Sequence, residues 1–376
     1  MNKIKVLEVI RQGQIGGGES HLIDLISGFG PEISPVVLSF TSGQMIDILR
    51  DKEITCFVIE TSHAFDFSVL QKIKEILKKE EIQIIHAHGS RASSNMVLLS
   101  RLMKIPMIYT VHGWSFHQDQ SKVVKSLRIA SEKIICSLSR KVICVSESNR
   151  ITGQKAFGLH NAIVIENGIN LQKFNPNNTF KDIRKEFGIQ PEDFIIGFIG
   201  RITIQKDPLT LIKSIESANS KQNKIKGLIV GDGDLKESVL KYINDHHLNS
   251  VIFTSGFKTE IPDILKAIDV FCLPSLWEGL SIALLEAMAM KRAVLVTPTD
   301  GTSEVVQDGI NGTITEFNNP FMLEEKILKY FYNPEQLHTH GENAAQFVKK
   351  RFDSKNVSLG VAELYQKILT EKHIAL

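Results

Sequence analysis

The strongest constraint on the fold is a repeated alternation between short apolar runs and longer amphipathic segments, which continues along the whole chain. Short apolar runs are typical of buried strands, and the amphipathic segments between them favour helices. Strands that alternate with helices predict an α/β fold in which crossover helices cover both faces of a parallel sheet. In the first half, the predicted strands are residues 6–10, 36–40, 55–59, 82–86, 107–110, 141–145 and 162–165.

The alternation pauses and then restarts, which indicates two domains. It stops at Asn167 and Gly168, passes through a polar stretch at residues 175–178, and resumes with a fully apolar run at residues 194–199. The chain has 376 residues, well above the roughly 150 of a usual single domain. We therefore expect two Rossmann-like domains, residues 1–168 and 169–354. In the second half, the predicted strands are residues 194–199, 226–230, 251–254, 270–273, 293–296 and 312–314.

The charge is nearly balanced overall but unevenly distributed. The 44 Lys and Arg against 42 Asp and Glu give a net charge of +2, which argues against a dedicated nucleic-acid binder. Residues 1–170 carry a net +4, and residues 120–141 alone carry +5 with interleaved apolar residues. This segment is interpreted as a basic amphipathic helix, and two readings stay open: a solvated helix face, or a surface for an anionic membrane or an acidic acceptor.

The cysteine pattern and the termini indicate the compartment. The four cysteines, at positions 56, 136, 144 and 272, include no CxxC pair, so we expect free thiols of a reducing, cytoplasmic environment and no structural zinc. The N-terminal apolar run is interrupted by Glu8, so no signal peptide is expected. No run of about 18 apolar residues occurs, so any membrane contact is expected to be peripheral.

A glycine-rich turn follows the first predicted strand. Gly16, Gly17 and Gly18 lead into a helix predicted from His21. Glycines let a ligand approach the backbone, and the N–H groups of a helix start favour an anion. The spacing is not GxGxxG and lacks the acidic residue expected about twenty positions later, so it does not predict a dinucleotide site. A tight turn without a ligand is an equally good reading.

Two cations follow the first strand of the second half. Gly200 and Arg201 stand at the strand's carboxyl end, and Lys206 comes just before a helix predicted to open near Asp207. Arginine binds two phosphate oxygens at once and lysine adds a point charge, so the pattern suits a diphosphate. Alternatively, Arg201 and Lys206 are solvated at the surface and bind no ligand.

Residues 274–290 add two carboxylates to this picture. Glu278 precedes Gly279, Leu280 and Ser281, where a strongly apolar helix is predicted to begin, and Glu286 lies eight residues after Glu278. The exposed N–H groups of such a helix start can bind a phosphate. A carboxylate among apolar neighbours needs hydrogen-bond donors, which sugar hydroxyls would supply and local backbone groups also could.

The combination of these motifs resembles the retaining GT-B glycosyltransferases of family 4. Glu278 and Glu286 match the E-x7-E signature of that family, inside the sequence PSLWEGLSIALLEAMA. The other matching positions follow in family order: Gly16-Gly17, His86-Ala87-His88, Thr110-Val111-His112-Gly113, Glu166-Asn167-Gly168, Gly200-Arg201 with Lys206, Gly231-Asp232-Gly233 and Glu304-Val305-Val306. The resemblance therefore covers most of the chain and implies two Rossmann-like domains that face a central cleft. Residues 355–376 are then expected to return to the first domain.

The resemblance implies a role for each matching residue. The catalytic candidates, which act on the donor diphosphate or lie at the face of the donor sugar, are His112, Arg201, Lys206 and Glu278. The donor-binding candidates are Gly16, Gly17, Gly200, Gly279, Leu280, Ser281 and Glu286, of which Glu286 would hold the ribose hydroxyls. His86 and His88 are assigned to the acceptor side.

The implied activity is transfer of a sugar with retention from a nucleotide diphosphate sugar to a glycan or lipid-linked acceptor of the cell surface. A UDP-sugar is preferred over GDP-mannose on general frequency alone. No cofactor and no metal is expected, and the partners are the donor and the acceptor, with no nucleic acid. Two alternatives stay open: an epimerase of the same fold that acts on a nucleotide sugar without an acceptor, and a non-catalytic protein that binds nucleotide sugars.

Two further patterns suggest a metal but favour other readings. Asp232-Gly233-Asp234 resembles the DxD motif of other glycosyltransferases, yet it follows a predicted strand where a turn is expected. His86 and His88 alternate along a strand without a third ligand nearby in the sequence. We therefore expect structural or acceptor-side roles for these residues.

Overall fold

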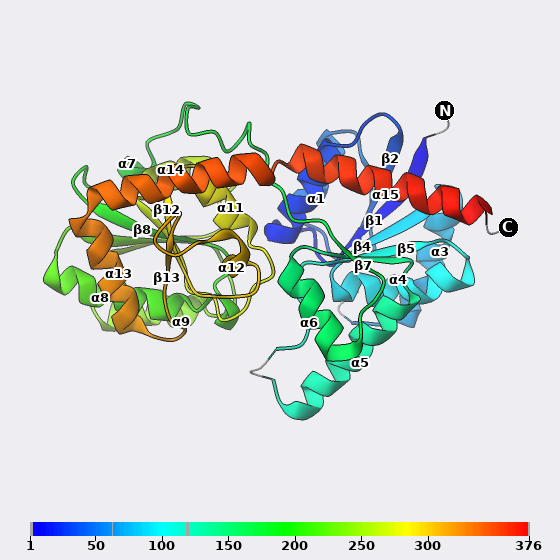
Figure 1. Ribbon diagram of the computed structural model, residues 1–376, viewed down its shortest axis with the longest axis horizontal. Coiled ribbons are helices and arrows are strands. Elements are labelled where there is room, and N and C mark those ends of the chain that lie inside the picture. Colours follow the sequence, from blue (N-terminus) through cyan, green and yellow to red (C-terminus); the bar gives the residue numbers. More distant parts are fainter. Residues whose placement is uncertain (1–2, 62, 118–119, 375–376) are drawn as a thin grey trace. The chain divides into compact units, whose positions relative to one another are not determined.

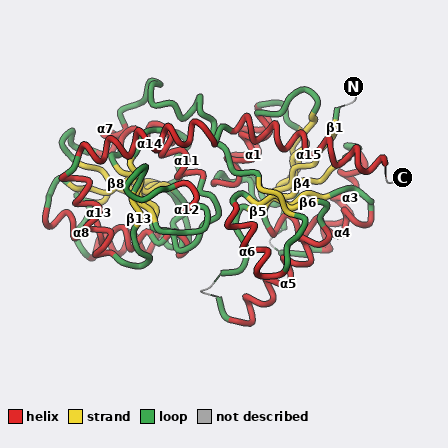
Figure 2. The backbone as a smooth tube through the Cα atoms, viewed as in Figure 1, coloured by secondary structure: helices red, strands yellow, loops and turns green. Residues whose placement is uncertain are grey.

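The computed structural model describes residues 3–61, 63–117 and 120–374. The chain forms two compact units, and each is described by itself: unit 1 comprises residues 1–168 and 354–376, and unit 2 comprises residues 169–353. Both units are Rossmann-like α/β domains (Figures 1 and 2). Ser354 belongs to unit 1, whereas the sequence assigned it to the second domain, because the last helix already begins at this residue.

Unit 1 is built on a parallel sheet with the strand order β3-β2-β1-β4-β5-β6-β7, as described over residues 3–61, 63–117 and 120–168. Successive residues of β1 project to opposite faces, so each face has its own core. Val6 and Ile10 belong to the core shared with the first and last helices, whereas Leu7 and Val9 belong to the other core. The strands are β1 (Ile4–Ile10), β2 (Ile33–Ser39), β3 (Thr55–Val58), β4 (Ile84–His88), β5 (Met107–Val111), β6 (Lys141–Cys144) and β7 (Ala162–Val164).

The helices of unit 1 cover both faces, and the last one comes from the far end of the chain. Helix α15 packs against α1 (Figure 1) and places Val361, Tyr365 and Ile368 in the same core as Leu22 and Leu25. The C-terminal segment therefore completes the first domain. The helices are α1 (Gly17–Ser27), α2 (Gln44–Asp51), α3 (Leu70–Lys79), α4 (Ser90–Leu102), α5 (Lys122–Leu138), α6 (Glu147–Phe157) and α15 (Ser354–Ile374), with a short 3-10 helix η1 (Phe67–Val69).

Unit 2 is built on a second parallel sheet with the order β10-β9-β8-β11-β12-β13, all of whose strands lie within the described residues. The central strands β8 and β11 are almost completely buried, as their unbroken apolar sequences require. The strands are β8 (Phe194–Ile199), β9 (Ile225–Val230), β10 (Ile252–Ser255), β11 (Val270–Leu273), β12 (Ala293–Val296) and β13 (Thr313–Ile314). The helices are α7 (Ile183–Phe187), α8 (Pro208–Lys221), α9 (Lys236–Asp245), α10 (Ile261–Ala267), α11 (Ile282–Ala289), α12 (Thr302–Val305), α13 (Pro320–Tyr332) and α14 (Pro334–Arg351), with a 3-10 helix η2 (Ile204–Lys206).

Two differences from the predicted bounds bear on the candidate residues. Strand β4 runs to His88, two residues past the predicted end at His86, because His88 is also buried and still pairs with β1. Helix α1 begins at Gly17, four residues before the predicted start at His21, so Gly17 and Gly18 form its first turn and Gly16 is its N-cap. In the described part of the chain, no helix combines the length and the apolar character that a membrane span requires.

Candidate functional site

Each sheet has one position where the chain order reverses direction, and the candidate residues gather there. In unit 2 this position lies between β8 and β11, because β9 and β10 extend the sheet on one side of β8 whereas β12 and β13 extend it on the other. Loops at the carboxyl ends of strands part at such a point and leave room for a ligand. The loop after β8 holds Arg201 and Lys206, and the loop after β11 holds Glu278.

An ion pair joins these two loops. The Nζ atom of Lys206 donates to Oε1 of Glu278, and the hydroxyl of Ser275 donates to the same oxygen at 2.9 Å. The side chains of Lys206 and Glu278 are only 13% and 9% exposed. Because a charge in so little water is costly without a partner, each side chain fixes the other. The sequence predicted both residues for one site, and the structure brings them into contact.

Backbone contacts hold the same two loops in register. The amide nitrogen of Leu276 donates to the carbonyl of Gln205 at 2.8 Å, and the Gln205 side chain donates to the carbonyl of Trp277 at 2.9 Å. Arg201, by contrast, is exposed. The site thus combines a positioned lysine with an arginine that is accessible to an anion.

Helix α11 begins directly after the Glu278–Ser281 segment, where the sequence predicted a helix start. Ser281 is the N-cap, and its hydroxyl accepts from the Leu284 amide at 3.4 Å. Gly279 and Leu280 are buried just before it. Glu286 lies on the same helix and is also buried, which confirms the burial expected from its neighbours. The N–H groups of the first turn and the helix dipole favour a negatively charged ligand at this end.

The Asp232-Gly233-Asp234 motif has a packing explanation. Gly231 and Gly233 have φ values of +150° and +159°, and a Cβ at either would collide with backbone carbonyls of the loop after β8, 1.9 Å from that of Gly200 and 2.3 Å from that of Ile202. Asp232 pairs with Lys236 at 2.7 Å at the surface. The Lys236 ammonium, together with the Gly233 amide, lowers the pKa of Asp232. The glycines let this turn support the loop that carries Arg201.

In unit 1 the chain order reverses between β1 and β4, where a buried cluster occupies the sheet. Residues Glu8, His86 and His88 project from one face of these two strands, since Glu8 pairs with His86 and residues two apart point the same way. The Nε2 atom of His88 lies 2.9 Å from Oε2 of Glu8, and the Tyr365 hydroxyl donates to Oε1 of Glu8 at 2.7 Å. All four side chains are buried. Helix α15 thus supplies part of this cluster.

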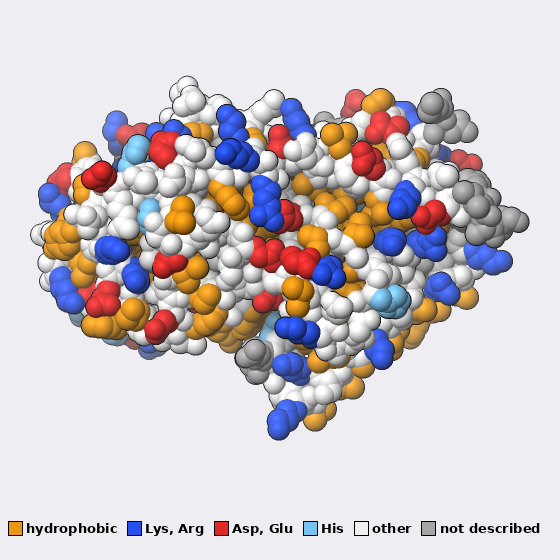
Figure 3. All heavy atoms as spheres, viewed as in Figure 1, with side chains coloured by type: hydrophobic (Ala, Val, Ile, Leu, Met, Phe, Trp, Pro, Cys, Tyr) orange, Lys and Arg blue, Asp and Glu red, His pale blue; other side chains and the backbone are white. Residues whose placement is uncertain are grey.

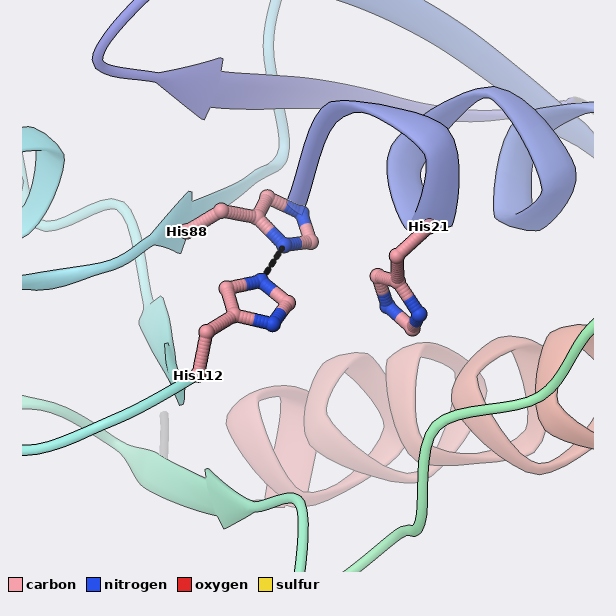
Figure 4. A group of neighbouring side chains, drawn as sticks. All are labelled: His21, His88 and His112. Carbon is pink, nitrogen blue, oxygen red and sulfur yellow. Dashed lines mark hydrogen bonds between the residues drawn. The ribbon is translucent and has the colours of Figure 1, made fainter. Parts of the chain in front are cut away.

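The hydrogen bonds determine which ring nitrogen of His88 and of His112 carries the hydrogen. A carboxylate only accepts, so Nε2 of His88 carries the hydrogen that it donates to Glu8. The Nδ1 atom of a neutral His88 then accepts, and Nε2 of His112 donates to it at 3.2 Å (Figure 4). This leaves Nδ1 of His112 with a lone pair. His112 can therefore accept a hydrogen bond at that atom, for example from a hydroxyl group.

His86, the other histidine of β4, also belongs to this hydrogen-bond network. The Tyr365 hydroxyl already donates to Glu8, so Nδ1 of His86 donates to the Tyr365 oxygen at 2.5 Å. The Nε2 atom of His86 then accepts from the Thr110 hydroxyl at 2.7 Å. Both ring nitrogens of His86 are used inside the domain. The acceptor-side role assigned to His86 and His88 stays a prediction.

Burial lowers the pKa values of three histidines in and beside this cluster. The pKa of His112 and the pKa of His86 lie well below the ordinary value, first because burial disfavours the charged ring and then because neighbouring histidines do. Burial, followed by the influence of His88, lowers the pKa of His21 to about 3. The ring of His21 lies edge-on to that of His112, with centroids 5.1 Å apart. These rings are thus poised as neutral donors and acceptors.

The same residues have the spacing of metal ligands. Ligand atoms of His21, His88 and His112 lie within 4.8 Å of one another, as do those of Glu8, His86 and His88. However, both nitrogens of His88 already form hydrogen bonds, and a metal would have to displace them. The geometry therefore supports a hydrogen-bonded chain, and the absence of a metal stays a prediction.

The glycine-rich turn lies beside this chain. A Cβ at Gly18 would approach His112 Cδ2 to 3.9 Å, so the first turn of α1 is next to the ring of His112. Glu19, in the same turn, is buried, and a Cβ at Gly16 would lie 2.9 Å from its carboxylate. An acidic side chain thus already occupies the helix end where the sequence suggested an anion. The donor-binding role of Gly16 and Gly17 stays a prediction.

Sequence reasoning missed three members of this cluster. Glu8 was noted only as an interruption of an apolar run, His21 only as the start of a helix, and Tyr365 was not considered. A carboxylate at a buried position of a strand requires hydrogen-bond donors, which is a signal that Glu8 could have given. No local pattern pointed to Tyr365, which is separated from Glu8 by 357 positions.

Family comparisons cover both units. The model of the family described as "Glycosyl transferases group 1" matches residues 179–347, and that of "Glycosyltransferase Family 4" matches residues 15–173. Among curated proteins, a "UDP-Gal:alpha-D-GlcNAc-diphosphoundecaprenol alpha-1,3-galactosyltransferase" of Escherichia coli is 31% identical over 291 residues, which are 74% of this chain and 75% of that protein. An "N,N'-diacetylbacillosaminyl-diphospho-undecaprenol alpha-1,3-N-acetylgalactosaminyltransferase" of Campylobacter jejuni is 25% identical over 85% of this chain and 88% of its own length.

Solved structures share the fold. The Anabaena protein HepE, solved in complex with UDP-glucose, matches with a TM-score of 0.86 and 20% identity, over 97% of this chain and 100% of that chain. HepE has also been solved with UDP and glucose, and that structure matches with a TM-score of 0.85 and 21% identity, over 96% of this chain and 99% of the other.

Proposed function

Since the chain belongs to the group 1 and family 4 glycosyltransferases with the GT-B fold, we propose that it transfers a sugar from a UDP-sugar to a glycan or lipid-linked acceptor with retention of configuration. The names of curated relatives, which describe sugar transferases, support this activity. Two of these names describe an acceptor that is linked to diphosphoundecaprenol. The UDP in the name of the Escherichia coli relative and in the HepE complexes supports the choice of donor.

The observation that carries the proposal is the contact between Lys206 and Glu278, together with the exposed Arg201 in the same loop as Lys206. In a sugar transfer, the bond between the anomeric carbon and the phosphate oxygen breaks, and negative charge grows on the departing diphosphate. Arg201 and Lys206 would stabilise that charge, because fixed cations act most strongly where charge develops in the transition state. Glu278 holds the Lys206 ammonium in place before the ligand arrives.

The remaining chemistry needs no protein nucleophile. The acceptor oxygen forms its bond to the anomeric carbon on the side that the phosphate leaves, and its proton passes to the departing phosphate oxygen. We assign the ribose hydroxyls to Glu286, whose buried carboxylate can accept two hydrogen bonds. The start of α11, from Gly279 to Ser281, would bind the donor phosphate or sugar through backbone N–H groups.

In unit 1, we assign His112 to the donor sugar. Its Nδ1 lone pair can accept a hydrogen bond from a sugar hydroxyl, and its neighbours fix this orientation. We expect the reaction to take place on the cytoplasmic side of the membrane, where nucleotide sugars would meet the acceptor. Neither an epimerase nor a non-catalytic binding protein is favoured, because the curated relatives are transferases by name.

A thermal-shift panel of nucleotides and nucleotide sugars tests the proposal. A ligand that binds only the folded protein raises its stability by about 2.7 kcal/mol at a concentration of about 100 times Kd. We expect UDP and one UDP-sugar to raise Tm more than GDP or GDP-mannose does. The Glu286→Gln variant should reduce the shift for UDP, since it weakens a contact to the ribose.

The result distinguishes the alternatives. A panel in which no nucleotide raises Tm would contradict the proposal. A larger shift with GDP-mannose would overturn only the choice of donor. Product analysis of the stabilising donor, incubated without an acceptor, would reveal an epimerase by rapid release of nucleotide.

A further inference from the structure

Helix α5 is apolar on two opposite sides. Its inner side carries Ile135 and Cys136, which are buried in the core of unit 1. Its outer side carries Val123, Leu127 and Ile134, which are 70%, 66% and 51% exposed. These three residues, with the exposed Ala130, follow the spacing i, i+4, i+7, i+11 that lines one side of a helix. We call these four residues the outer stripe.

The exposed charges of α5 all have the same sign. Glu132 is its single acidic residue and is buried. Its carboxylate accepts from the hydroxyls of Ser90, Ser115 and Tyr109 at 2.5, 2.6 and 3.0 Å. The acidic group is therefore satisfied within the domain and does not neutralise the surface.

Basic residues border the outer stripe. At 100° per residue, Lys133 and Lys122 lie about 90° and 110° round the helix from the centre of the stripe on one side, and Arg128 lies about 130° round on the other side; all three are exposed. No carboxylate among the described residues forms an ion pair with any of them. An apolar stripe between two basic borders is the pattern of a helix that lies in the interface of an anionic bilayer.

The neighbouring helix extends this surface. Helix α4 packs against α5 and exposes Leu98, Leu102 and Arg101. Figure 3 shows hydrophobic and basic side chains next to each other over the region where Figure 1 places α4 and α5. Two helices that pack against each other thus both expose apolar and basic side chains.

Charge argues against a second copy of the chain as the partner. A twofold-symmetric contact brings a surface against itself, which would place Lys122, Arg128 and Lys133 opposite the same basic residues. Like charges across an interface oppose association. An anionic lipid surface matches both the apolar stripe and its basic borders.

We infer that the outer stripe of α5 enters the headgroup region of an anionic bilayer while Lys122, Arg128 and Lys133 bind lipid phosphates. This inference deepens the proposed function, on which it rests for its purpose, because a lipid-linked acceptor would be presented at that surface. The binding itself needs neither donor nor acceptor. It can therefore be measured independently of transfer.

Vesicle sedimentation of the full chain tests the inference. We expect binding to vesicles of equal parts phosphatidylcholine and phosphatidylglycerol, and far weaker binding to phosphatidylcholine alone. Each basic residue near such a surface contributes about fivefold in affinity, so replacing Lys122, Arg128 and Lys133 by Gln should weaken binding by about a hundredfold. Val123→Ser with Leu127→Ser should weaken it by about tenfold or more, through lost apolar burial.

Matched controls come from unit 2. The exposed Lys224, Lys349 and Lys350, replaced together by Gln, remove the same charge and should leave binding unchanged. Phe321→Ser removes an apolar residue with 61% exposure and should also have no effect. Each variant is checked for the UDP-induced rise in Tm, which confirms folding and reports on the proposed function separately.

Three outcomes would overturn the inference. The first is equal binding to neutral and anionic vesicles, and the second is binding that survives the serine variant. The third is a wild-type dimer that the serine variant converts to a monomer, which would make the stripe an interface between copies. If vesicles bind but no nucleotide raises Tm, the proposed function fails while the inference stands.

Discussion

The two sheets place chemically different groups at equivalent positions. In unit 1 the reversal between β1 and β4 is filled by Glu8, His86 and His88, whose hydrogen-bonding atoms find partners within the domain. In unit 2 the reversal between β8 and β11 carries Lys206 and Glu278 on loops, with Arg201 exposed. A shared fold thus supports a buried, preorganised hydrogen-bond network in one unit and a site with an accessible cation in the other. The comparison predicts that substitutions in unit 2 weaken the stabilisation of a charged ligand. Substitutions in unit 1 instead change which ring nitrogen of a histidine carries the hydrogen.

The largest effect is expected from the cations of unit 2. Arg201→Ala or Lys206→Ala should each lower kcat by about 10²–10³, because each removes a charge that stabilises the departing diphosphate. Steady-state kinetics with the donor identified by thermal shift measures this. Lys236→Ala, which removes a surface lysine paired with Asp232, is the control and should leave kcat nearly unchanged. Unchanged turnover in the Arg201 variant would contradict a catalytic role for the site.

The next effect is acid destabilisation that arises in unit 1. His21, His86 and His112 have pKa values lowered by burial, so below pH about 6.5 the unfolded chain binds protons that the folded protein does not. The free energy of unfolding should therefore fall as pH decreases through this range, by about 1.4 kcal/mol per pH unit for each such histidine at most. Urea unfolding at several pH values measures the slope.

A pair of variants separates these histidines from other titrating groups. His21→Gln should give a shallower slope than the wild type, because one buried neutral ring is removed. His160→Gln, at an exposed position, should leave the slope as it is. Equal slopes in all three proteins would mean that the buried histidines do not control acid stability.

A smaller effect on turnover is expected from Glu8→Gln. The amide can donate as well as accept, so it no longer fixes the hydrogen on Nε2 of His88, and His112 loses its defined orientation. We expect kcat to fall by about tenfold, the lower part of the range for a positioned proton partner, while the Kd for UDP stays the same.

Nitrogen-15 NMR of the histidine rings provides the direct readout. In the wild type, His112 should show the hydrogen on Nε2, and in Glu8→Gln a mixture of the two neutral forms. Tyr365→Phe removes one donor to the same carboxylate but keeps its charge, so His112 should keep its form. An unchanged spectrum in Glu8→Gln would show that Glu8 does not position His112.

The smallest effect is expected from metal removal. The Asp232-Gly233-Asp234 turn has a structural explanation, and the histidines form hydrogen bonds with one another. Dialysis against EDTA should therefore leave both kcat and Tm unchanged. Loss of activity that added divalent metal restores would overturn this prediction and direct attention to His21, His88 and His112.

The fold was largely predictable because the apolar runs are short and regularly spaced. Strands β8, β11 and β12 have the predicted bounds, since each is a continuous apolar run between clear breaks. Strand β4 is shifted by two residues, to Ile84–His88, because pairing with β1 continues from Ile84 to His88. The start of α1 was missed because glycine disfavours helices, and its first turn is set by packing next to His112.

The two candidate sites differ in how far the sequence could predict them. In unit 2 the residues stand next to glycines at strand ends, so local patterns identified Arg201, Lys206 and Glu278. In unit 1 the partners of His88 and His112 depend on sheet register and on a helix from the other end of the chain. Glu8 gave only the signal of a carboxylate inside an apolar run, which does not identify its partners, and Tyr365 gave no local signal at all.

The contact between Glu8 and Tyr365 has a consequence for synthesis on the ribosome. Unit 2 is one continuous segment, residues 169–353, so it can fold as soon as it has left the ribosome. Unit 1 begins earlier but is completed only by α15, whose core residues Tyr365 and Ile368 are made after the whole of unit 2. Until then one face of its sheet lacks the part of its cover that α15 supplies, and the Glu8 carboxylate lacks its tyrosine donor. Unit 1 therefore starts before unit 2 and is finished after it, and a nascent chain stopped before residue 354 would expose part of that face to chaperones and proteases.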